Sequence, residues 1–274
     1  MDLQLEGKRA LVTGSSSGIG AATAALLAAE GALVAVHGRN AERAEEVGAE
    51  IRAAGGTAIV VVGDLADDDE AAAVCAKVDA EFGGADIVFN NAGGRNPGKP
   101  ATTGFLDIEP ADWISTYNTN VVSAVRMIRH FAPGMIERRW GRFIQNASAS
   151  ATSPGYMLND YAAAKAAILN LTSGLAKALA GTGVTATTIS PGMTMTPSVS
   201  GAYMASYAEE QGWDATLPES ELEKMWARHR GLATVGGGRV EHIASAVAWL
   251  ASPLGGYCDG ANIRVDGGQN QNIN

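Results

Sequence analysis

The chain begins with a short apolar segment that runs directly into a glycine-rich turn and then into an alanine-rich stretch. Ala10, Leu11 and Val12 form the apolar segment, and the predicted helix covers residues 21–30. Glycines at such a turn let backbone N–H groups at the start of the helix approach a pyrophosphate, because a Cβ there would collide or a positive φ is needed. The turn therefore predicts dinucleotide binding through the residues Gly14, Ser15, Ser17, Gly18, Ile19 and Gly20.

Short apolar segments alternate with predicted helices along most of the chain. Strands are predicted at residues 32–37, 57–62, 85–90, 142–147, 184–190 and 262–265, and helices at residues 41–54, 112–139, 159–180 and 241–251. The connections are long enough for crossovers, so the pattern predicts an α/β fold with a parallel, doubly wound sheet and helices on both faces. A chain of 274 residues can bury a full core, and we expect one domain over residues 1–274.

The charge balance and the cysteine count exclude several classes of function. A formal net charge of −9 argues against a nucleic-acid partner and against an anionic membrane surface, because both favour basic protein patches. Cys75 and Cys258 form no metal-ligand spacing, and we interpret the acidic cluster at residues 67–70 as a helix cap. Residues 1–9 hold no hydrophobic signal segment, and no apolar run is long enough to span a bilayer. We expect a cytoplasmic protein without a metal or a membrane, acting on a small soluble molecule.

The second predicted strand ends at Gly38 and Arg39, and Asn40 is placed to cap the next helix. In dinucleotide folds the tip of this strand meets the adenosine ribose, where an acidic residue would bond the 2′-hydroxyl. No acid is present here, and Arg39 can instead pair with a 2′-phosphate. This residue predicts that NADP(H) is preferred and that NAD(H) is a second possibility. The alternative is a solvated loop arginine.

Tyr161 and Lys165 lie four residues apart in the helix predicted at residues 159–180, so their side chains project from one face. A free tyrosine hydroxyl titrates near ~10, and a neighbouring cation lowers its pKa by stabilising the phenolate. Lys165 is placed to be that cation. Ser148 follows the apolar segment at residues 142–147 and can donate a hydrogen bond to a substrate oxygen. Such a pair also occurs by chance on many helices, so the pair alone leaves a structural interpretation open.

Residues 193–238 interrupt the alternation of strands and helices. The segment is dense in large apolar side chains, among them Met193, Tyr203 and Trp213. We interpret it as a lid that closes over the nicotinamide and offers an apolar wall to the substrate. A satellite core or an oligomer contact is the alternative interpretation. The expected substrate contacts are Ser150, Met193, Tyr203 and Trp213.

Further motifs follow the later strands in a fixed order. After Thr13-Gly14-x-x-x-Gly18-x-Gly20 come Asp64-Leu65, Asn90-Asn91-Ala92-Gly93, Asn120, Ser148, Tyr161-x-x-x-Lys165, Pro191-Gly192-x-Thr194 and Val265-Asp266-Gly267-Gly268. With this set the chain resembles the short-chain dehydrogenase/reductase family over nearly its whole length. The resemblance implies a Rossmann-type sheet of seven parallel strands that binds NAD(P) at its carboxyl edge. It also implies hydride transfer between nicotinamide and a carbonyl carbon.

The resemblance implies a role for each motif residue. Tyr161 would be the general acid for ketone reduction and the base in the reverse direction, while Lys165 lowers its pKa and holds the nicotinamide ribose. Ser148 would orient the carbonyl, and Asn120 would hold a water that relays protons to Lys165. Coenzyme contacts would come from Asp64 and Leu65 at the adenine, from Asn91, Ala92 and Gly93 on the adenosine side, and from Pro191, Gly192 and Thr194 at the carboxamide.

Two other functions compete with an NADP(H)-dependent ketone reductase or alcohol dehydrogenase acting on an apolar or aromatic-bearing substrate. One is a 3-oxoacyl-thioester reductase, although the insertion at residues 193–238 is longer than in the compact acyl-carrier reductases. The other is a non-catalytic dinucleotide-sensing module, against which the complete set of Asn120, Ser148, Tyr161 and Lys165 argues. Members of the family usually form tetramers through the helices here predicted at residues 112–139 and 159–180, so we expect a homotetramer.

Overall fold

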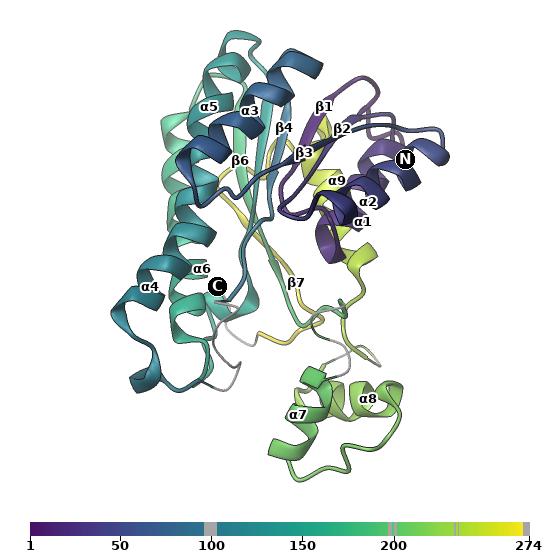
Figure 1. The fold of residues 1–274 in the computed structure, drawn as a ribbon, viewed down its shortest axis with the longest axis vertical. Coiled ribbons are helices and arrows are strands. Elements are labelled where there is room, and N and C mark those ends of the chain that lie inside the picture. The colour runs from purple at the N-terminus through teal and green to yellow at the C-terminus, as the bar shows by residue number, and fades with distance from the viewer. Residues whose placement is uncertain (96–102, 197–198, 200–201, 233, 235, 271–274) are drawn as a thin grey trace.

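The computed structural model describes residues 1–95, 103–196, 199, 202–232, 234 and 236–270. Its centre is a sheet of seven parallel strands in the order β3-β2-β1-β4-β5-β6-β7 (Figure 1). The strands are β1 Arg9–Val12, β2 Leu33–Gly38, β3 Thr57–Val62, β4 Ile87–Asn90, β5 Gly141–Asn146, β6 Val184–Pro191 and β7 Asn262–Val265. The parallel, doubly wound sheet expected from the sequence is confirmed.

Helices cover both faces of the sheet (Figure 1). One face packs against α1 Gly18–Ala29, α2 Ala41–Ala53 and α9 Val240–Ala251. The other face packs against α3 Asp68–Phe82, α5 Ser123–Glu137 and α6 Asn159–Ala178. The central strands are apolar on both sides, as parallel sheets require, because neither face meets water.

The predicted helix caps are present. Asn40 accepts a hydrogen bond from the backbone N–H of Arg43 at the start of α2. Asp67 accepts from the N–H groups of Asp69 and Glu70 at the start of α3, so the acidic cluster is a cap. Within the described ranges, no three or more His, Cys, Asp and Glu side chains gather as metal ligands would. In the same ranges no helix has both the length and the hydrophobicity that crossing a membrane requires.

The single helix predicted at residues 112–139 is divided into three parts. These are α4 Pro110–Tyr117, a π-helical turn Asn118–Val122, and α5, which continues through Pro133. A π-turn adds a residue to the turn and re-aims the side chains that follow it, and such turns are frequent at functional sites. Here the turn buries Asn120, which faces the carboxyl edge of the sheet.

The insertion at residues 193–238 folds into the helices α7 Ala202–Glu210 and α8 Glu219–His229, which lie apart from the sheet in Figure 1. These helices have a small apolar core of their own, built around Met204, Leu222 and Trp226. Trp213 belongs to this cluster, with its ring 5.8 Å from that of Tyr207 and 5.5 Å from that of His229. These side chains therefore form a satellite core, which was the alternative interpretation.

A narrow backbone junction connects this unit to the sheet. The N–H of Met195 donates to the carbonyl of Gly238 at 2.8 Å, and the N–H of Gly238 donates to the carbonyl of Met193 at 2.9 Å. The two ends of the insertion therefore leave the sheet side by side.

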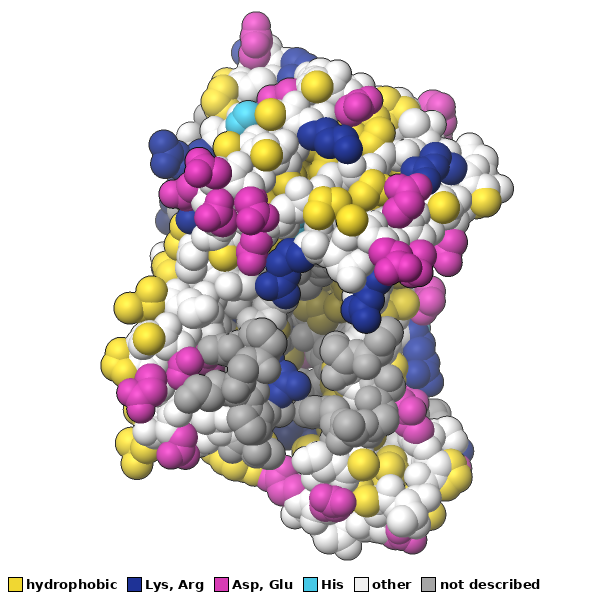
Figure 2. All heavy atoms as spheres, in the orientation of Figure 1, with side chains coloured by type: hydrophobic (Ala, Val, Ile, Leu, Met, Phe, Trp, Pro, Cys, Tyr) yellow, Lys and Arg dark blue, Asp and Glu magenta, His cyan; other side chains and the backbone are white. Residues whose placement is uncertain are grey.

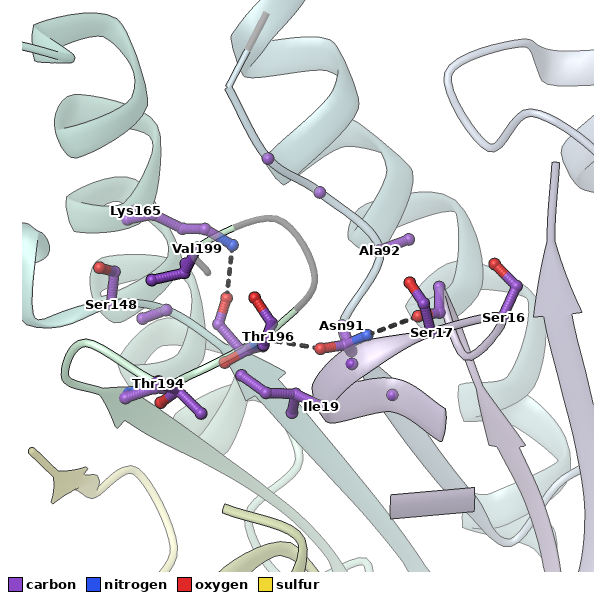
Figure 3. Close-up of a pocket in the computed structure, with 18 of the residues that line it drawn as sticks. Ser16, Ser17, Ile19, Asn91, Ala92, Ser148, Lys165, Thr194, Thr196 and Val199 are labelled. Atoms are coloured by element: carbon purple, nitrogen blue, oxygen red, sulfur yellow. Dashed lines mark hydrogen bonds between the residues drawn. The ribbon is translucent and has the colours of Figure 1, made fainter. Parts of the chain in front are cut away.

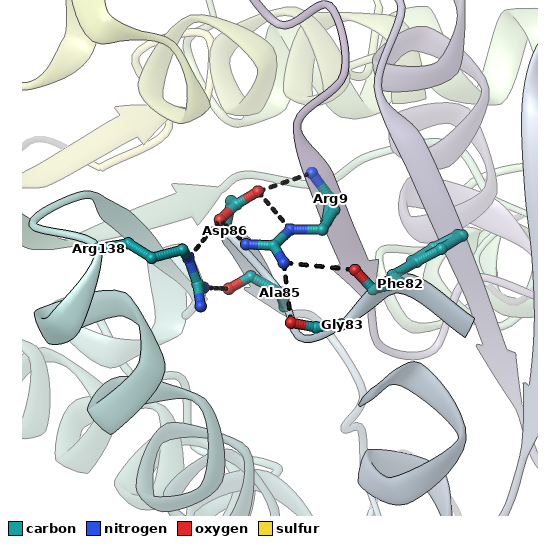
Figure 4. Close-up of polar contacts among 6 residues, drawn as sticks. All are labelled: Arg9, Phe82, Gly83, Ala85, Asp86 and Arg138. Atoms are coloured by element: carbon teal, nitrogen blue, oxygen red, sulfur yellow. Dashed lines mark hydrogen bonds and ion pairs between the residues drawn. The ribbon is translucent and has the colours of Figure 1, made fainter. Parts of the chain in front are cut away.

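A buried ion cluster holds the opposite, amino-terminal edge of the sheet (Figure 4). Asp86, 8% exposed, accepts hydrogen bonds from Nε of Arg9 at 2.7 Å and from Nε of Arg138 at 3.1 Å. Burial alone raises the pKa of the Asp86 carboxyl, but the hydrogen bonds and charge of Arg9, with the charge of Arg138, outweigh it and lower this pKa below its ordinary value. The cluster joins β1, β4 and α5 far from the carboxyl edge.

We expect Asp86→Asn to lower the free energy of unfolding by about 3 kcal/mol at neutral pH, because it leaves two guanidinium groups without their carboxylate. The folded state lowers the pKa of Asp86, so this stabilisation is complete above the unfolded pKa of ~3.9 and disappears as the pH falls through the folded pKa. Urea unfolding at several pH values measures both effects. The control is Asp68→Asn, which removes an exposed ion pair with Arg126 and should cost below about 1 kcal/mol. Equal costs for the two variants would contradict the argument.

Candidate active site

A cavity of about 820 Å³ opens at the carboxyl edge of the sheet. Figure 3 shows Lys165 and Ser148 at one end and Ser16 and Ser17 of the glycine turn at the other. The lining comes from five places: residues 14 and 16–20, residues 91–94, residues 146–148, Tyr161 with Lys165 of α6, and residues 191–194, 196 and 199, with Arg43 and Glu46 of α2 at the rim. The sheet thus brings the predicted dinucleotide turn and the predicted catalytic residues to one cavity.

The glycine turn has no room for side chains at two of its positions. A Cβ on Gly14, where φ is +65°, would lie 2.9 Å from Cα of Ala92, and a Cβ on Gly20 would lie 2.3 Å from the carbonyl oxygen of Gly14. Asn91 closes the turn from the side, since its Nδ2 donates to the carbonyls of Thr13 and Gly14 at 2.9 and 3.0 Å. The geometry fits a turn whose backbone comes close to a phosphate group.

His37, which the sequence did not single out, holds this turn through a hydrogen bond to its backbone. The N–H of Gly14 donates to Nδ1 of His37 at 2.9 Å, so the other ring nitrogen, Nε2, must carry the proton that it donates to the carbonyl of Gly63 at 3.0 Å. Burial lowers the pKa of His37 to about 4 and keeps the ring neutral. Only the register of β2 against β1 brings this side chain under the turn, and no local motif signals that contact.

The expected catalytic groups lie together on α6 and at the end of β5. Lys165 is 3% exposed, its Nζ donates to the backbone carbonyl of Asn146 at 2.7 Å, and it lies 5.5 Å from the centre of the Tyr161 ring. Ser148 accepts hydrogen bonds from the hydroxyl of Ser150 at 2.9 Å and from its N–H at 3.2 Å. Tyr161, Lys165 and Ser148 all line the cavity.

The electrostatics of this group differ from the expectation. Burial raises the pKa of the Tyr161 hydroxyl above its ordinary value, and contact with Ser148 lowers it only in part. Burial also lowers the pKa of Lys165, to about 8. The expected lowering of the Tyr161 pKa by Lys165 is therefore wrong for this structure, because desolvation dominates and the ammonium group is directed to Asn146.

Asn120 binds the loop after β4. Its Nδ2 donates to the carbonyls of Gly94 at 2.7 Å and Thr116 at 2.9 Å, and its Oδ1 accepts from the N–H of Gly94 at 3.0 Å. Both amide hydrogens are thus used on backbone groups. A relay water would have to use the remaining lone pair of Oδ1 or the backbone.

Several expected coenzyme residues are not among those that line the cavity. Ser15 is fully buried, and its Oγ donates to the carbonyl of Val12 at 2.7 Å, so its side chain faces the core. Leu65 packs in the core beside α3 and α5. Arg39 is exposed and lies 3.6 Å from the carboxylate of Asp64. Pro191, Gly192 and Thr194 line the cavity as expected.

Among the expected substrate residues, Met193 lines the cavity. Ser150 bonds to Ser148, and Trp213 packs in the satellite core instead of facing the cavity. The side chain of Tyr203 and much of the loop at residues 95–108 lie outside the described residues. Lining residues that the sequence did not predict are Ser16, Arg43, Glu46, Gly94, Asn146, Ala147, Thr196 and Val199.

Comparison with known proteins identifies the family. The sequence model described as short chain dehydrogenase matches residues 8–205. The chain belongs to the short-chain dehydrogenases. It is an oxidoreductase of the kind that acts on CH–OH groups with a nicotinamide dinucleotide.

Three relatives illustrate the range of this family. An uncharacterized oxidoreductase of Bacillus subtilis, YvaG, is 34% identical over 270 residues, which cover 98% of each chain. The 3-oxoacyl-[acyl-carrier-protein] reductase FabG of Vibrio cholerae is 32% identical over 266 residues, covering 97% of this chain and 98% of FabG. The L-sorbose reductase of Gluconobacter frateurii, solved with NADPH and L-sorbose, has a TM-score of 0.90 and 29% identity over the full length of both chains.

We expect His37 to make the protein sensitive to mild acid. The folded pKa of about 4 lies below the ordinary 6.5, so the unfolded chain takes up a proton first as the pH falls. The stabilisation is complete above pH ~6.5 and decreases by about 2–3 kcal/mol on acidification to about pH 4.5. His37→Gln keeps a donor and an acceptor without titrating. On the same acidification, its free energy of unfolding in urea should therefore fall less than that of wild type, by that amount. His130→Gln, at an exposed histidine, is the control, and identical pH dependence in all three proteins would refute the role of His37.

Proposed function

We propose that this short-chain dehydrogenase transfers hydride between NADP(H) and a ketone or secondary alcohol, with an apolar or aromatic-bearing substrate. The observation that carries the proposal is the convergence of Tyr161, Lys165 and Ser148 on the cavity that also holds the glycine turn. The steric limits at Gly14 and Gly20 support a dinucleotide in that cavity.

In the proposed reaction, Tyr161 gives its hydroxyl proton to the carbonyl oxygen during reduction and takes it back in the reverse direction. Ser148 donates a hydrogen bond to the same oxygen and orients it. Lys165 supplies positive charge beside Tyr161, and its remaining N–H groups are available to ribose hydroxyls. The nicotinamide, when bound, supplies or accepts the hydride. The raised pKa of Tyr161 favours the protonated form that reduction needs.

Two alternatives use the same site. A 3-oxoacyl-thioester reductase would also need Tyr161 and Ser148, and the similarity to FabG favours it as the second candidate. A dinucleotide-sensing module would bind coenzyme without turnover. Coenzyme oxidation followed against a panel of ketones and acyl thioesters separates the three, because the module gives no turnover with any of them.

The insertion is proposed to act as a lid. Met193 reaches the cavity from the junction of the α7–α8 unit, so a movement of that unit would change the substrate end of the site. The apolar character of Met193 supports an apolar substrate.

We also propose a homotetramer in the cytoplasm. Large apolar side chains are exposed near α4, including Phe105, Leu106 and Ile114, of which Ile114 is 71% exposed. Figure 2 shows hydrophobic side chains on the surface over the region where Figure 1 places α4. Exposed apolar groups of this kind favour association. The free cysteines Cys75 and Cys258 agree with a reducing compartment.

We expect Tyr161→Phe to lower turnover by at least ~10², because the variant lacks the proton donor. Coenzyme affinity should change by less than about twofold, since the ring and Lys165 remain. Steady-state kinetics and fluorescence titration with NADPH measure the two quantities. Tyr257→Phe, at a fully exposed tyrosine, is the control. Near-normal turnover of Tyr161→Phe would exclude the proposed chemistry.

We expect NADPH to be preferred over NADH by about 10–100-fold, from one charge-assisted contact between Arg39 and the 2′-phosphate. Arg39→Gln should remove most of the preference by raising the Kd for NADPH, whereas Arg129→Gln, on the exposed side of α5, should not. Converting Gly38 to aspartate is a poor alternative test, because its Cβ would lie 2.8 Å from Cβ of Ser16. A wild-type preference for NADH would contradict the proposed contact between Arg39 and the 2′-phosphate.

A further inference from the structure

A continuous chain of hydrogen bonds connects the glycine turn to Lys165 through two asparagine side chains. Nδ2 of Asn91 donates to the carbonyls of Thr13 and Gly14 in the turn. Oδ1 of Asn91 accepts from Nδ2 of Asn146 at 2.8 Å. The backbone carbonyl of Asn146 accepts from Nζ of Lys165 at 2.7 Å. Figure 3 marks hydrogen bonds of this chain with dashed lines at Asn91 and at Lys165.

The polarity of the chain is determined at each step. Two backbone carbonyls face one end of the Asn91 amide, so that end must be the NH₂ group and the other end must be the acceptor. The group that meets this acceptor must therefore be a donor, and Asn146 supplies it. An aspartate at position 146 has the same shape but presents only acceptors when ionised, so it could not complete the chain.

The environment of Asn146 argues against a role in packing alone. Its Oδ1 is buried and accepts no hydrogen bond from any described residue. An unsatisfied buried acceptor costs about 1–3 kcal/mol, whereas an apolar side chain of similar size at this position would not incur that cost. The donor Nδ2 and its bond to Asn91 account for an amide here.

The position of the Lys165 ammonium group depends on Asn146. Within the described part of the chain, its ammonium group makes one hydrogen bond, to the carbonyl of Asn146, although it carries three donors. A displacement of the Asn146 backbone would therefore displace the ammonium group that the proposed reaction uses.

We infer that Asn146 is a positioning residue that couples the glycine turn to Lys165, so that seating of the coenzyme phosphates and placement of the cation depend on one another. The inference rests on the proposed function for the use made of Lys165. It concerns the chain's own residues and needs no contact between Asn146 and substrate.

Coenzyme affinity without substrate tests the coupling. We expect Asn146→Asp to raise the Kd for NADPH about tenfold in fluorescence titrations at neutral pH and to lower kcat by a similar factor. Lys165→Met should also raise the Kd. In the double variant the combined increase should be at least threefold smaller than the product of the two single increases, because both changes interrupt one chain.

The control is Asn118→Asp, which makes the same change at another half-buried amide whose Nδ2 donates to the backbone carbonyl of Ala66 at 2.9 Å, outside the cavity. Its Kd for NADPH should stay within about twofold of wild type. Asn146→Leu repeats the cycle without adding charge, and serves alone if the aspartate variant does not fold. A purely structural role for Asn146 predicts lower thermal stability with Kd increases that multiply, and that result would overturn the inference. Since no substrate enters the titration, failure to find a ketone substrate would count against the proposed function only.

Discussion

The parallel pairing of β1 with β2 and β4 is the constraint on which the site depends. Val12, the last residue of β1, lies opposite Val36 on one side and Phe89 on the other, so β1 ends one residue before β4 and two residues before β2. Thr13 uses this alignment, since its Oγ1 accepts from the N–H groups of Asn91 and Ala92, both at 2.9 Å. The loop after β4 is thereby attached to the glycine turn before any ligand contributes.

At the carboxyl edge of the sheet, burial favours the neutral forms of the titratable side chains. Burial lowers the pKa of both Lys165 and His37 and raises that of Tyr161. The charged form of Lys165 is disfavoured by about 3 kcal/mol, from the displacement of its pKa to about 8. The Asp86 cluster at the other edge shows the opposite balance, because two guanidinium groups compensate one buried carboxylate. Burial of Lys165 at one edge thus lowers stability, and ion pairing at the other edge contributes to it.

The sequence predicts what depends on local pattern. Alternating apolar segments indicate the strands, and the four-residue spacing of Tyr161 and Lys165 brings both to one cavity. Contacts between distant segments carry no such pattern. The support of Gly14 by His37 and the bond between Asn91 and Asn146 require the strand register, which a single sequence does not specify. Likewise, the π-turn at Asn118–Val122 gives no signal of its own, because the sequence there has the periodicity of an ordinary α-helix. Aromatic content at residues 193–238 indicated burial, but whether Trp213 packs on a substrate or on Tyr207 depends on how α7 and α8 meet.

The junction at Met193–Met195 and Gly238 lies between the sheet and the α7–α8 unit. Among the described residues, two backbone hydrogen bonds hold the ends of the insertion together, and Glu223 of α8 accepts further hydrogen bonds from the N–H of Gly237 and from Arg239. Within the part of the chain that the structure describes, the apolar core of the α7–α8 unit contains no residue of a strand. The insertion thus forms a separately packed unit whose two ends meet where β6 leaves the sheet.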